Sequence, residues 1–126
     1  MTESVAPPPG TVLCKPDALD DPGAKGFTFG HGADRFDMFL VRKDGAVHAY
    51  LNECPHAHAR LDNWPDKFLT LDETRIVCGV HAALFEIESG LCTSGPCTGR
   101  RLTPVAVEVI DGEVRIAASQ PATNRP

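Results

Sequence analysis

The sequence has no long apolar run, which excludes a membrane-spanning helix. Its longest stretches of consecutive apolar residues are four residues, Met38 to Val41 and Ala82 to Phe85, whereas a spanning helix needs about 20. Residues 1–10 also have no early Lys or Arg and no apolar core segment, so they do not resemble a secretory signal. We therefore expect no membrane anchor and a cytoplasmic location.

Basic residues are also scarce. Lys and Arg number 12 against 17 Asp and Glu, which gives a formal net charge of −5. Such a chain has no basic footprint to attract a phosphate backbone or an anionic lipid surface, so we expect neither nucleic acid nor a membrane as a partner. With 126 residues, 42% of them hydrophobic and 23% charged, the chain is predicted to fold as one packed domain.

No segment keeps a 3.6-residue apolar period over several turns, and only Pro16 to Leu19 is predicted as a single helical turn. Instead, 11 Gly and 11 Pro separate short segments rich in Val, Ile, Leu and Phe, which predicts an all-β, antiparallel fold. Asp-Gly pairs at 44–45 and 111–112 predict tight hairpin turns. Strands are expected at residues 36–42, 46–51, 68–71, 75–78, 84–87, 91–93, 105–109 and 113–116, with Cys14 in an edge strand and flexible tails at 1–10 and 118–126.

Five Cys and five His are many for so short a chain, and four of them form two dyads. These are Cys54-Pro55-His56 and Cys78-Gly79-Val80-His81, each directly after a predicted strand. Two neighbouring strands would present both loops at one end of a sheet, which makes one site with four ligands. Two thiolates and two imidazoles suit either zinc or an iron-sulfur cluster. Because each loop mixes one Cys with one His, the spacing favours a two-iron cluster over structural zinc.

The residues around these dyads resemble the soluble Rieske-type 2Fe-2S ferredoxins of ring-hydroxylating dioxygenase systems. The resemblance covers residues 36–116 and includes Asn52 to His56, Leu61, Cys78 to Phe85, Gly90 and Gly95-Pro96. It implies an antiparallel β-sandwich over residues 11–117 with a small cluster-binding lobe at about 52–98. It also implies that Cys54 and Cys78 bind the inner iron and that His56 and His81 bind the outer iron.

The resemblance implies an electron carrier rather than an enzyme. A flavin-dependent reductase would supply single electrons, and a terminal oxygenase would accept them. No G-x-S-x-G segment, phosphate-binding glycine loop or 2-His-1-carboxylate triad is found in the sequence, which agrees with a non-catalytic role. The alternative is a zinc-stabilised structural or interaction module that uses the same four ligands for folding alone.

Three departures from this family are visible. Between His56 and Cys78 lie 21 residues, more than is usual, and the surplus is expected to form a hairpin at 68–75. His58 stands where the family usually has Gly. Ala83 and Phe85 occupy the positions of a Ser and a Tyr that donate hydrogen bonds to cluster sulfur, so we predict a low potential, roughly −150 mV rather than +300 mV.

The remaining Cys and His are interpreted mainly as packing or surface residues. Cys92 and Cys97 are expected to be free, half-buried thiols, since disulfides are rare in a reducing compartment. His58 either lines the cluster loop or faces solvent. The other expectations are packing for Cys14, packing of the 68–75 hairpin for Trp64, surface or strand positions for His31 and His48, and a solvated turn for Arg100 and Arg101.

Overall fold

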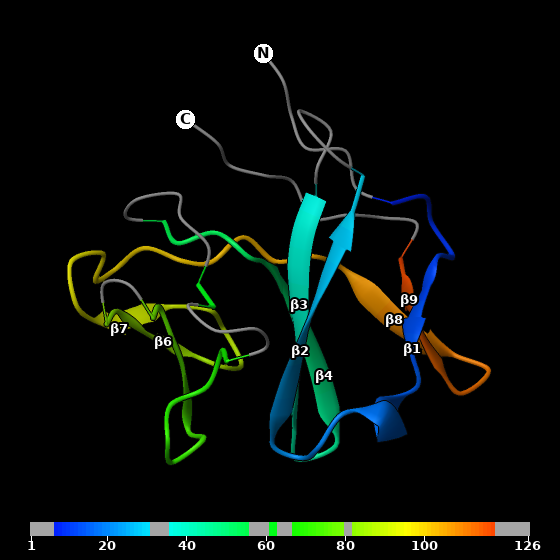
Figure 1. Cartoon of the computed structure of the whole chain (residues 1–126), viewed down its shortest axis with the longest axis horizontal. Coiled ribbons are helices and arrows are strands. Elements are labelled where there is room, and N and C mark those ends of the chain that lie inside the picture. The colour runs from blue at the N-terminus through cyan, green and yellow to red at the C-terminus, as the bar shows by residue number, and fades with distance from the viewer. Residues whose placement is uncertain (1–6, 31–35, 56–60, 63–66, 80–81, 118–126) are drawn as a thin grey trace.

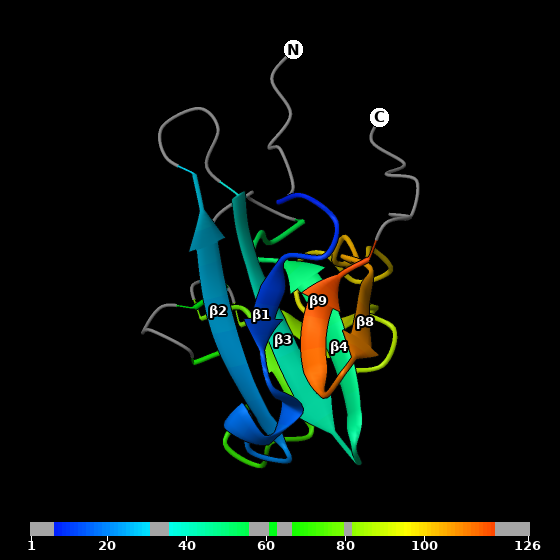
Figure 2. The ribbon, with the colours of Figure 1, turned by 90° about the vertical axis from the view of Figure 1, so that its right-hand side faces the viewer.

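The computed structural model describes residues 7–30, 36–55, 61–62, 67–79 and 82–117, and within these ranges the chain forms three antiparallel three-stranded sheets. The central sheet has the order β2-β3-β4, and the outer sheet has the order β1-β9-β8. The third sheet, β5-β6-β7, belongs to a separate lobe. Figure 1 shows the lobe on one side of the central sheet and the outer sheet on the other, and Figure 2 shows the outer sheet in front of β3 and β4. The strands are β1 Val12–Cys14, β2 Gly23–Phe29, β3 Phe36–Lys43, β4 Ala46–Leu51, β5 Arg75–Val77, β6 Leu84–Glu86, β7 Cys92–Ser94, β8 Val107–Ile110 and β9 Glu113–Ile116, with a 3-10 turn η1 at Pro16–Ala18.

Strand β3 lies between two hydrophobic cores. Phe39 and Val41 belong to the core shared with the lobe, whereas Met38 and Leu40 belong to the core shared with the outer sheet. Successive side chains of a strand point to opposite faces, so a strand covered on both faces needs apolar residues at every position. This explains why the run from Met38 to Val41 is continuous rather than alternating.

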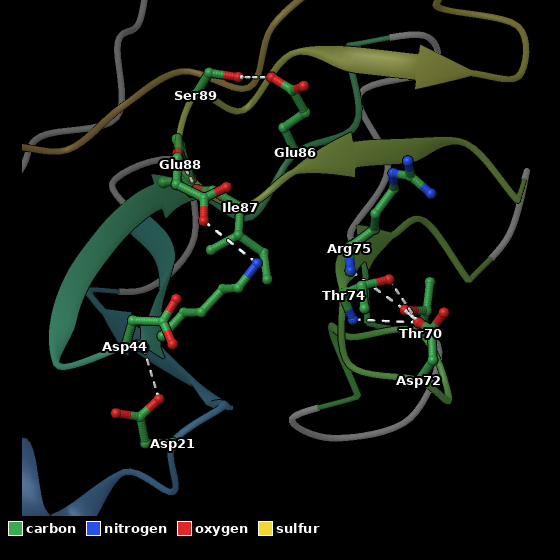
Figure 3. A network of polar contacts seen from close by, with 12 residues as sticks. Asp21, Asp44, Thr70, Asp72, Thr74, Arg75, Glu86, Ile87, Glu88 and Ser89 are labelled. Carbon is green, nitrogen blue, oxygen red and sulfur yellow. Dashed lines mark hydrogen bonds and ion pairs between the residues drawn. The ribbon is translucent and has the colours of Figure 1, made fainter.

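Both predicted Asp-Gly hairpins are confirmed. In the first, β3 pairs with β4, and Asp44 and Gly45 adopt positive φ values of 52° and 80°. The Asp21 carboxylate accepts hydrogen bonds of 2.8 Å from both turn amides, and Figure 3 shows the one from Asp44. The second turn, at Asp111 and Gly112, has the same signs of φ. Its first strand starts two residues later than expected, because the Val105 amide donates instead to the Ala49 carbonyl oxygen of β4.

Strand β2 was not predicted, although it pairs with β3 along its full length from Gly23 to Phe29. Two of its residues are glycines and one is lysine, which weakens the apolar alternation. In the lobe, the expected strand at 68–71 is reduced to a bridge between Leu69 and Ile76, so the pairing extends one residue past the hairpin expected at 68–75. The Asp72 carboxylate closes this hairpin by accepting hydrogen bonds from Thr70 and Thr74 (Figure 3), and these bonds lower its pKa to about 2.

The lobe is docked on the central sheet by aromatic packing and one buried hydrogen bond. The rings of Phe39 and Phe68 stack with their centroids 4.3 Å apart and an interplanar angle of 5°. The Tyr50 hydroxyl donates a 2.6 Å hydrogen bond to the Ile87 carbonyl oxygen. At the rim, the Lys43 ammonium lies 3.4 Å from the Glu88 carboxylate (Figure 3).

In the described segments no helix is long and apolar enough to cross a membrane.

Candidate metal centre

The two cysteines of the predicted ligand set lie where two strands end. Cys54 follows β4 and Cys78 follows β5, and both side chains are fully buried in the core shared by the lobe and the central sheet. His56 and His81 lie outside the described residues, as do His31, His58 and Trp64. The structure therefore positions the two thiols and leaves the two imidazole ligands as a prediction from the sequence.

The second dyad begins in a tight loop that connects β5 to β6. The Cys78 amide donates to the Ala83 carbonyl oxygen at 2.9 Å, and the Ala82 amide donates back to the Cys78 carbonyl oxygen at 2.8 Å. Ala82 has a φ of 57°, a left-handed conformation that costs a non-glycine residue free energy. The loop thus brings the backbone of Ala83 directly beside that of Cys78.

The segment after the first dyad is fixed by Asn52, a buried polar residue that directly follows β4. Its side-chain oxygen accepts a 2.7 Å hydrogen bond from the Leu61 amide, and its side-chain amide donates to Asp62 at 2.9 Å. The Leu61 carbonyl oxygen then accepts a 2.8 Å hydrogen bond from the Gly79 amide. Leu61 therefore connects the segments that carry the two cysteines.

A third segment, around Gly95, closes over the second loop. Gly95 has a φ of +102°, and a Cβ atom built there would lie 2.8 Å from the Ala83 Cα. From the same segment, the exposed Arg100 guanidinium donates a 3.1 Å hydrogen bond to the carbonyl oxygen of Pro55. Arg100 is therefore not only a solvated turn residue, because it holds the Gly95 segment beside the first dyad.

Cys92 and Cys97 are more deeply buried than expected. They are 1% and 2% exposed, and their sulfur atoms lie 3.2 Å apart as free thiols. Both residues belong to the same buried core as Cys54. Burial, and then the neighbouring sulfurs of Cys92 and Cys54, raise the pKa of Cys97 to about 12. The C-x4-C spacing in the sequence gave no sign that this pair would share a core with Cys54 of the first dyad.

The sulfurs of Cys54, Cys92 and Cys97 do not make a metal site on their own. In the described ranges, no group of three or more His, Cys, Asp or Glu side chains is arranged so that it could hold a metal ion. The remaining predictions outside this cluster hold where the structure describes them. Cys14 is partly buried in edge strand β1, next to the outer core, and His48 is partly buried in β4.

The chemistry of the donors fits a cluster with mixed ligands. Two buried thiols enter from two connected loops, and the small residues Ala83 and Gly95 pack against each other beside them. Ala83 and Phe85, both fully buried, bring no side-chain hydrogen-bond donor to this region. An apolar shell of this kind controls solvent access to a metal site.

Comparison with known proteins gives a consistent result. A model of the Rieske [2Fe-2S] domain matches residues 11–116. The ferredoxin of carbazole 1,9a-dioxygenase from Nocardioides aromaticivorans is 25% identical and has a TM-score of 0.64, over 90% of this chain and 100% of that chain. A Sphingomonas yanoikuyae ferredoxin is 26% identical, with the same TM-score of 0.64, over 89% and 99%.

A further solved structure agrees in fold. It is the complex of reduced oxygenase and oxidized ferredoxin in carbazole 1,9a-dioxygenase, with 24% identity, a TM-score of 0.70 and coverage of 89% of this chain and 95% of that chain. No curated protein matches the sequence. Nothing in these comparisons supports the zinc alternative.

Proposed function

The chain belongs to the Rieske [2Fe-2S] domain family, and on this premise we propose that Cys54, His56, Cys78 and His81 are the ligands of its two-iron cluster. Cys54 and Cys78 would hold the inner iron as thiolates, and His56 and His81 would hold the outer iron through ring nitrogens. The observation that supports this assignment best is that both cysteines are fully buried and that Leu61 connects their segments. We further propose residues 11–117 as the functional domain and 52–98 as its cluster-binding lobe.

The function that follows is one-electron transfer. When bound, a Rieske cluster accepts and releases single electrons, at a potential set by its charge, its hydrogen bonds and its exposure to solvent. The protein's own contribution is to enclose the sulfur ligands in an apolar core that includes Leu61, Phe85 and Cys97. With four protein ligands on two irons, no coordination position is left open for a substrate. The chain is therefore an electron-transfer component and not a catalytic subunit.

We propose a terminal oxygenase as the electron acceptor and a flavin-dependent reductase as the electron donor. Two structural neighbours of nearly the same length are ferredoxins, and one of them belongs to carbazole 1,9a-dioxygenase. A ferredoxin of similar fold is also known in complex with an oxygenase. A chain that exchanges electrons with such enzymes would work in the cytoplasm, where its cysteines would remain reduced.

The ligand assignment is tested by analysing purified protein for iron, acid-labile sulfide and zinc. We expect two irons and two sulfides per chain and a red-brown colour. The reduced state should have an EPR spectrum with a lower average g value than an all-cysteine cluster gives. Cys54→Ser, Cys78→Ser, His56→Ala and His81→Ala should each lose the cluster, whereas Cys14→Ser should keep it. A colourless protein with one zinc would instead support the folding module.

The partner assignment needs a separate measurement. The reduced protein is mixed anaerobically with an oxidised ring-hydroxylating oxygenase, and reoxidation is followed in the visible spectrum. We expect second-order kinetics that depend on oxygenase concentration. The reverse step uses a flavin-dependent reductase with NADH or NADPH to reduce the oxidised protein. A protein that holds its cluster but exchanges electrons with neither enzyme would keep its cofactor assignment and lose its proposed partners.

A further inference from the structure

Two cysteines outside the predicted ligand set form a buried thiol pair beneath an exposed turn. Cys92 begins β7, and Cys97 lies in the turn that follows this strand. Their side chains are 1% and 2% exposed, and the Cys97 thiol donates a hydrogen bond to the Cys92 sulfur at 3.2 Å. The residues around Cys97, at 93–96 and 98–100, are all exposed. The pair therefore lies one layer beneath the surface, at the outer end of the lobe (Figure 1).

We propose that Cys92 and Cys97 are a redox-sensitive dithiol, which a peroxide converts to an intramolecular disulfide that restrains the turn between them. Both are thiols in the resting protein, because buried cysteines react slowly. The turn above them has no apolar cover of its own, and segments of this kind open locally at low cost in free energy. A small oxidant then reaches the two sulfurs.

The reaction takes two steps and consumes one hydrogen peroxide. In the first, one sulfur attacks the peroxide, so that an S–O bond forms, the O–O bond breaks, and a sulfenic acid and one water result. In the second, the other sulfur attacks the sulfenic sulfur, so that the S–S bond forms and the S–O bond breaks. The departing hydroxide takes the proton of the attacking thiol and leaves as a second water. The two thiols are oxidised by two electrons, and the peroxide is reduced by two.

The positions of the two side chains suit this closure. A disulfide has an S–S length of about 2.05 Å, so sulfurs that start 3.2 Å apart need to approach by only about 1 Å. The Cys92 thiol donates its proton to the Ser94 carbonyl oxygen at 3.2 Å, and this bond is lost when the disulfide forms. Since Ser94 is exposed, water can replace the lost donor. Closure therefore leaves no buried acceptor without a partner.

The backbone already holds both cysteines in one turn. The Cys92 amide donates to the Arg100 carbonyl oxygen at 2.8 Å, and the Cys92 carbonyl oxygen accepts from the Gly99 amide at 3.0 Å. The Cys97 carbonyl oxygen accepts a 2.9 Å hydrogen bond from the Arg100 amide. A disulfide would add a covalent link across residues that these hydrogen bonds already bring together.

The same turn covers the loop that carries Cys78. Gly95 lies between the two cysteines, and a Cβ atom built on it would be 2.8 Å from the Ala83 Cα. The Ala83 carbonyl oxygen in turn accepts a 2.9 Å hydrogen bond from the Cys78 amide. A cross-linked turn opens less readily, so the disulfide should keep this loop covered. This protective role, but not the disulfide itself, rests on the ligand assignment made above.

The disulfide is tested by treating the purified holoprotein with hydrogen peroxide while its visible spectrum is followed. Free thiols are blocked with one alkylating reagent, disulfides are reduced and labelled with a second reagent, and mass spectrometry assigns each cysteine. We expect the second label on Cys92 and Cys97 together, and on neither when dithiothreitol precedes the first reagent. Cys92→Ala should remove the second label from Cys97, and Cys97→Ala should remove it from Cys92. Cys14→Ser is the control and should change neither.

The disulfide is refuted if both cysteines carry only the first label at peroxide concentrations that bleach the cluster or oxidise Cys14. Persistence of the second label on Cys97 in Cys92→Ala would also overturn it, because Cys97 would then pair with a different cysteine. If a variant does not fold, fragment spectra of the unmodified protein decide, since the segment from Cys92 to Cys97 should be two hydrogens lighter after oxidation.

The protective role is tested by the rate at which a chelator removes iron. Oxidised protein that keeps its visible spectrum should release iron several-fold more slowly than the same protein treated with dithiothreitol. Cys92→Ala should show no such difference after the same peroxide treatment. Equal or faster release from the oxidised protein would overturn the protective role. Absence of a cluster from the unmodified protein would instead refute the proposed function, and the labelling of the cysteines would still decide whether the disulfide forms.

Discussion

The side-chain oxygen of Asn52 accepts a 2.7 Å hydrogen bond from the backbone amide of Leu61. Asn52 directly follows β4 and precedes Cys54 by two residues, and Leu61 is the first described residue after the first dyad. Since the Leu61 carbonyl oxygen also binds the Gly79 amide, this one side chain fixes the point where both ligand segments meet. The only buried polar or charged residue of the described chain is thus a structural support of the candidate site.

Asn52→Ala should therefore destabilise both the fold and the cluster. It leaves the Leu61 amide without its acceptor, and an unsatisfied buried donor costs about 1–3 kcal/mol. Urea unfolding followed by circular dichroism would measure the loss, and decay of the visible absorption would measure cluster release. Asn52→Asp separates the two contacts, because it keeps an acceptor for Leu61 but places a second carboxylate against Asp62. If Asn52→Ala matched the unmodified protein in both measurements, Asn52 would not support the site.

Ala82→Gly should stabilise the protein. Ala82 has a φ of 57° and an exposed side chain, so its Cβ adds left-handed strain with no burial to offset it. Removing that strain is worth about 1 kcal/mol, after the entropic cost of a glycine is subtracted. Ala46→Gly is the control, since Ala46 is also exposed but lies in strand β4, where glycine should destabilise. A lower unfolding midpoint for Ala82→Gly would show that the Cβ makes a favourable contact.

Tyr50 should make the fold sensitive to alkaline pH. Burial and the nearby Glu88 carboxylate raise the pKa of Tyr50 to about 12, from an ordinary value of 10.0. A raised folded-state pKa contributes stability that is fully present below pH 10 and is lost as the pH rises toward 12. The free energy of unfolding should therefore fall across this range, and Tyr50→Phe should remove that part of the pH dependence.

The ionisation itself can be followed directly, because Tyr50 is the chain's single tyrosine. Difference absorbance at 295 nm should report tyrosinate formation near pH 12 in the folded protein and near pH 10 in urea. Ionisation near pH 10 in the folded state would mean that the Tyr50 hydroxyl is not buried beside Glu88 in solution.

The sequence could predict the features that local chemistry decides. The Asp-Gly turns determine two hairpins, because their backbone needs positive φ at both central residues. The Cys-x-His and Cys-x-x-His dyads indicate a mixed-ligand site, because ligand spacing is itself a local property. By contrast, β2 is a strand because it pairs with β3, and its Gly23 and Gly26 give no local signal of that pairing. Likewise, Cys97 and Cys54 lie in one buried core although they are 43 positions apart in the sequence, and only the folded chain brings them into it.

Gly95 provides the most direct test of how closely the third segment must pack on the candidate site. Gly95→Ala would place a Cβ 2.8 Å from the Ala83 Cα, and a backbone atom cannot move aside as a flexible side chain does. We expect the segment from Ser94 to Cys97 to be displaced, so that a chelator removes iron faster. Gly99→Ala is the matched control.

Gly99 has a similar φ of +91°, but a Cβ there would meet no atom within 4 Å. Both substitutions carry the left-handed strain of about 1–2 kcal/mol, so both should lower the unfolding midpoint. Only Gly95→Ala adds the clash with Ala83, and only it should speed iron loss. Equal rates of iron release in the two variants would mean that backbone strain alone determines the rate. The contact between Gly95 and Ala83 would then not protect the cluster.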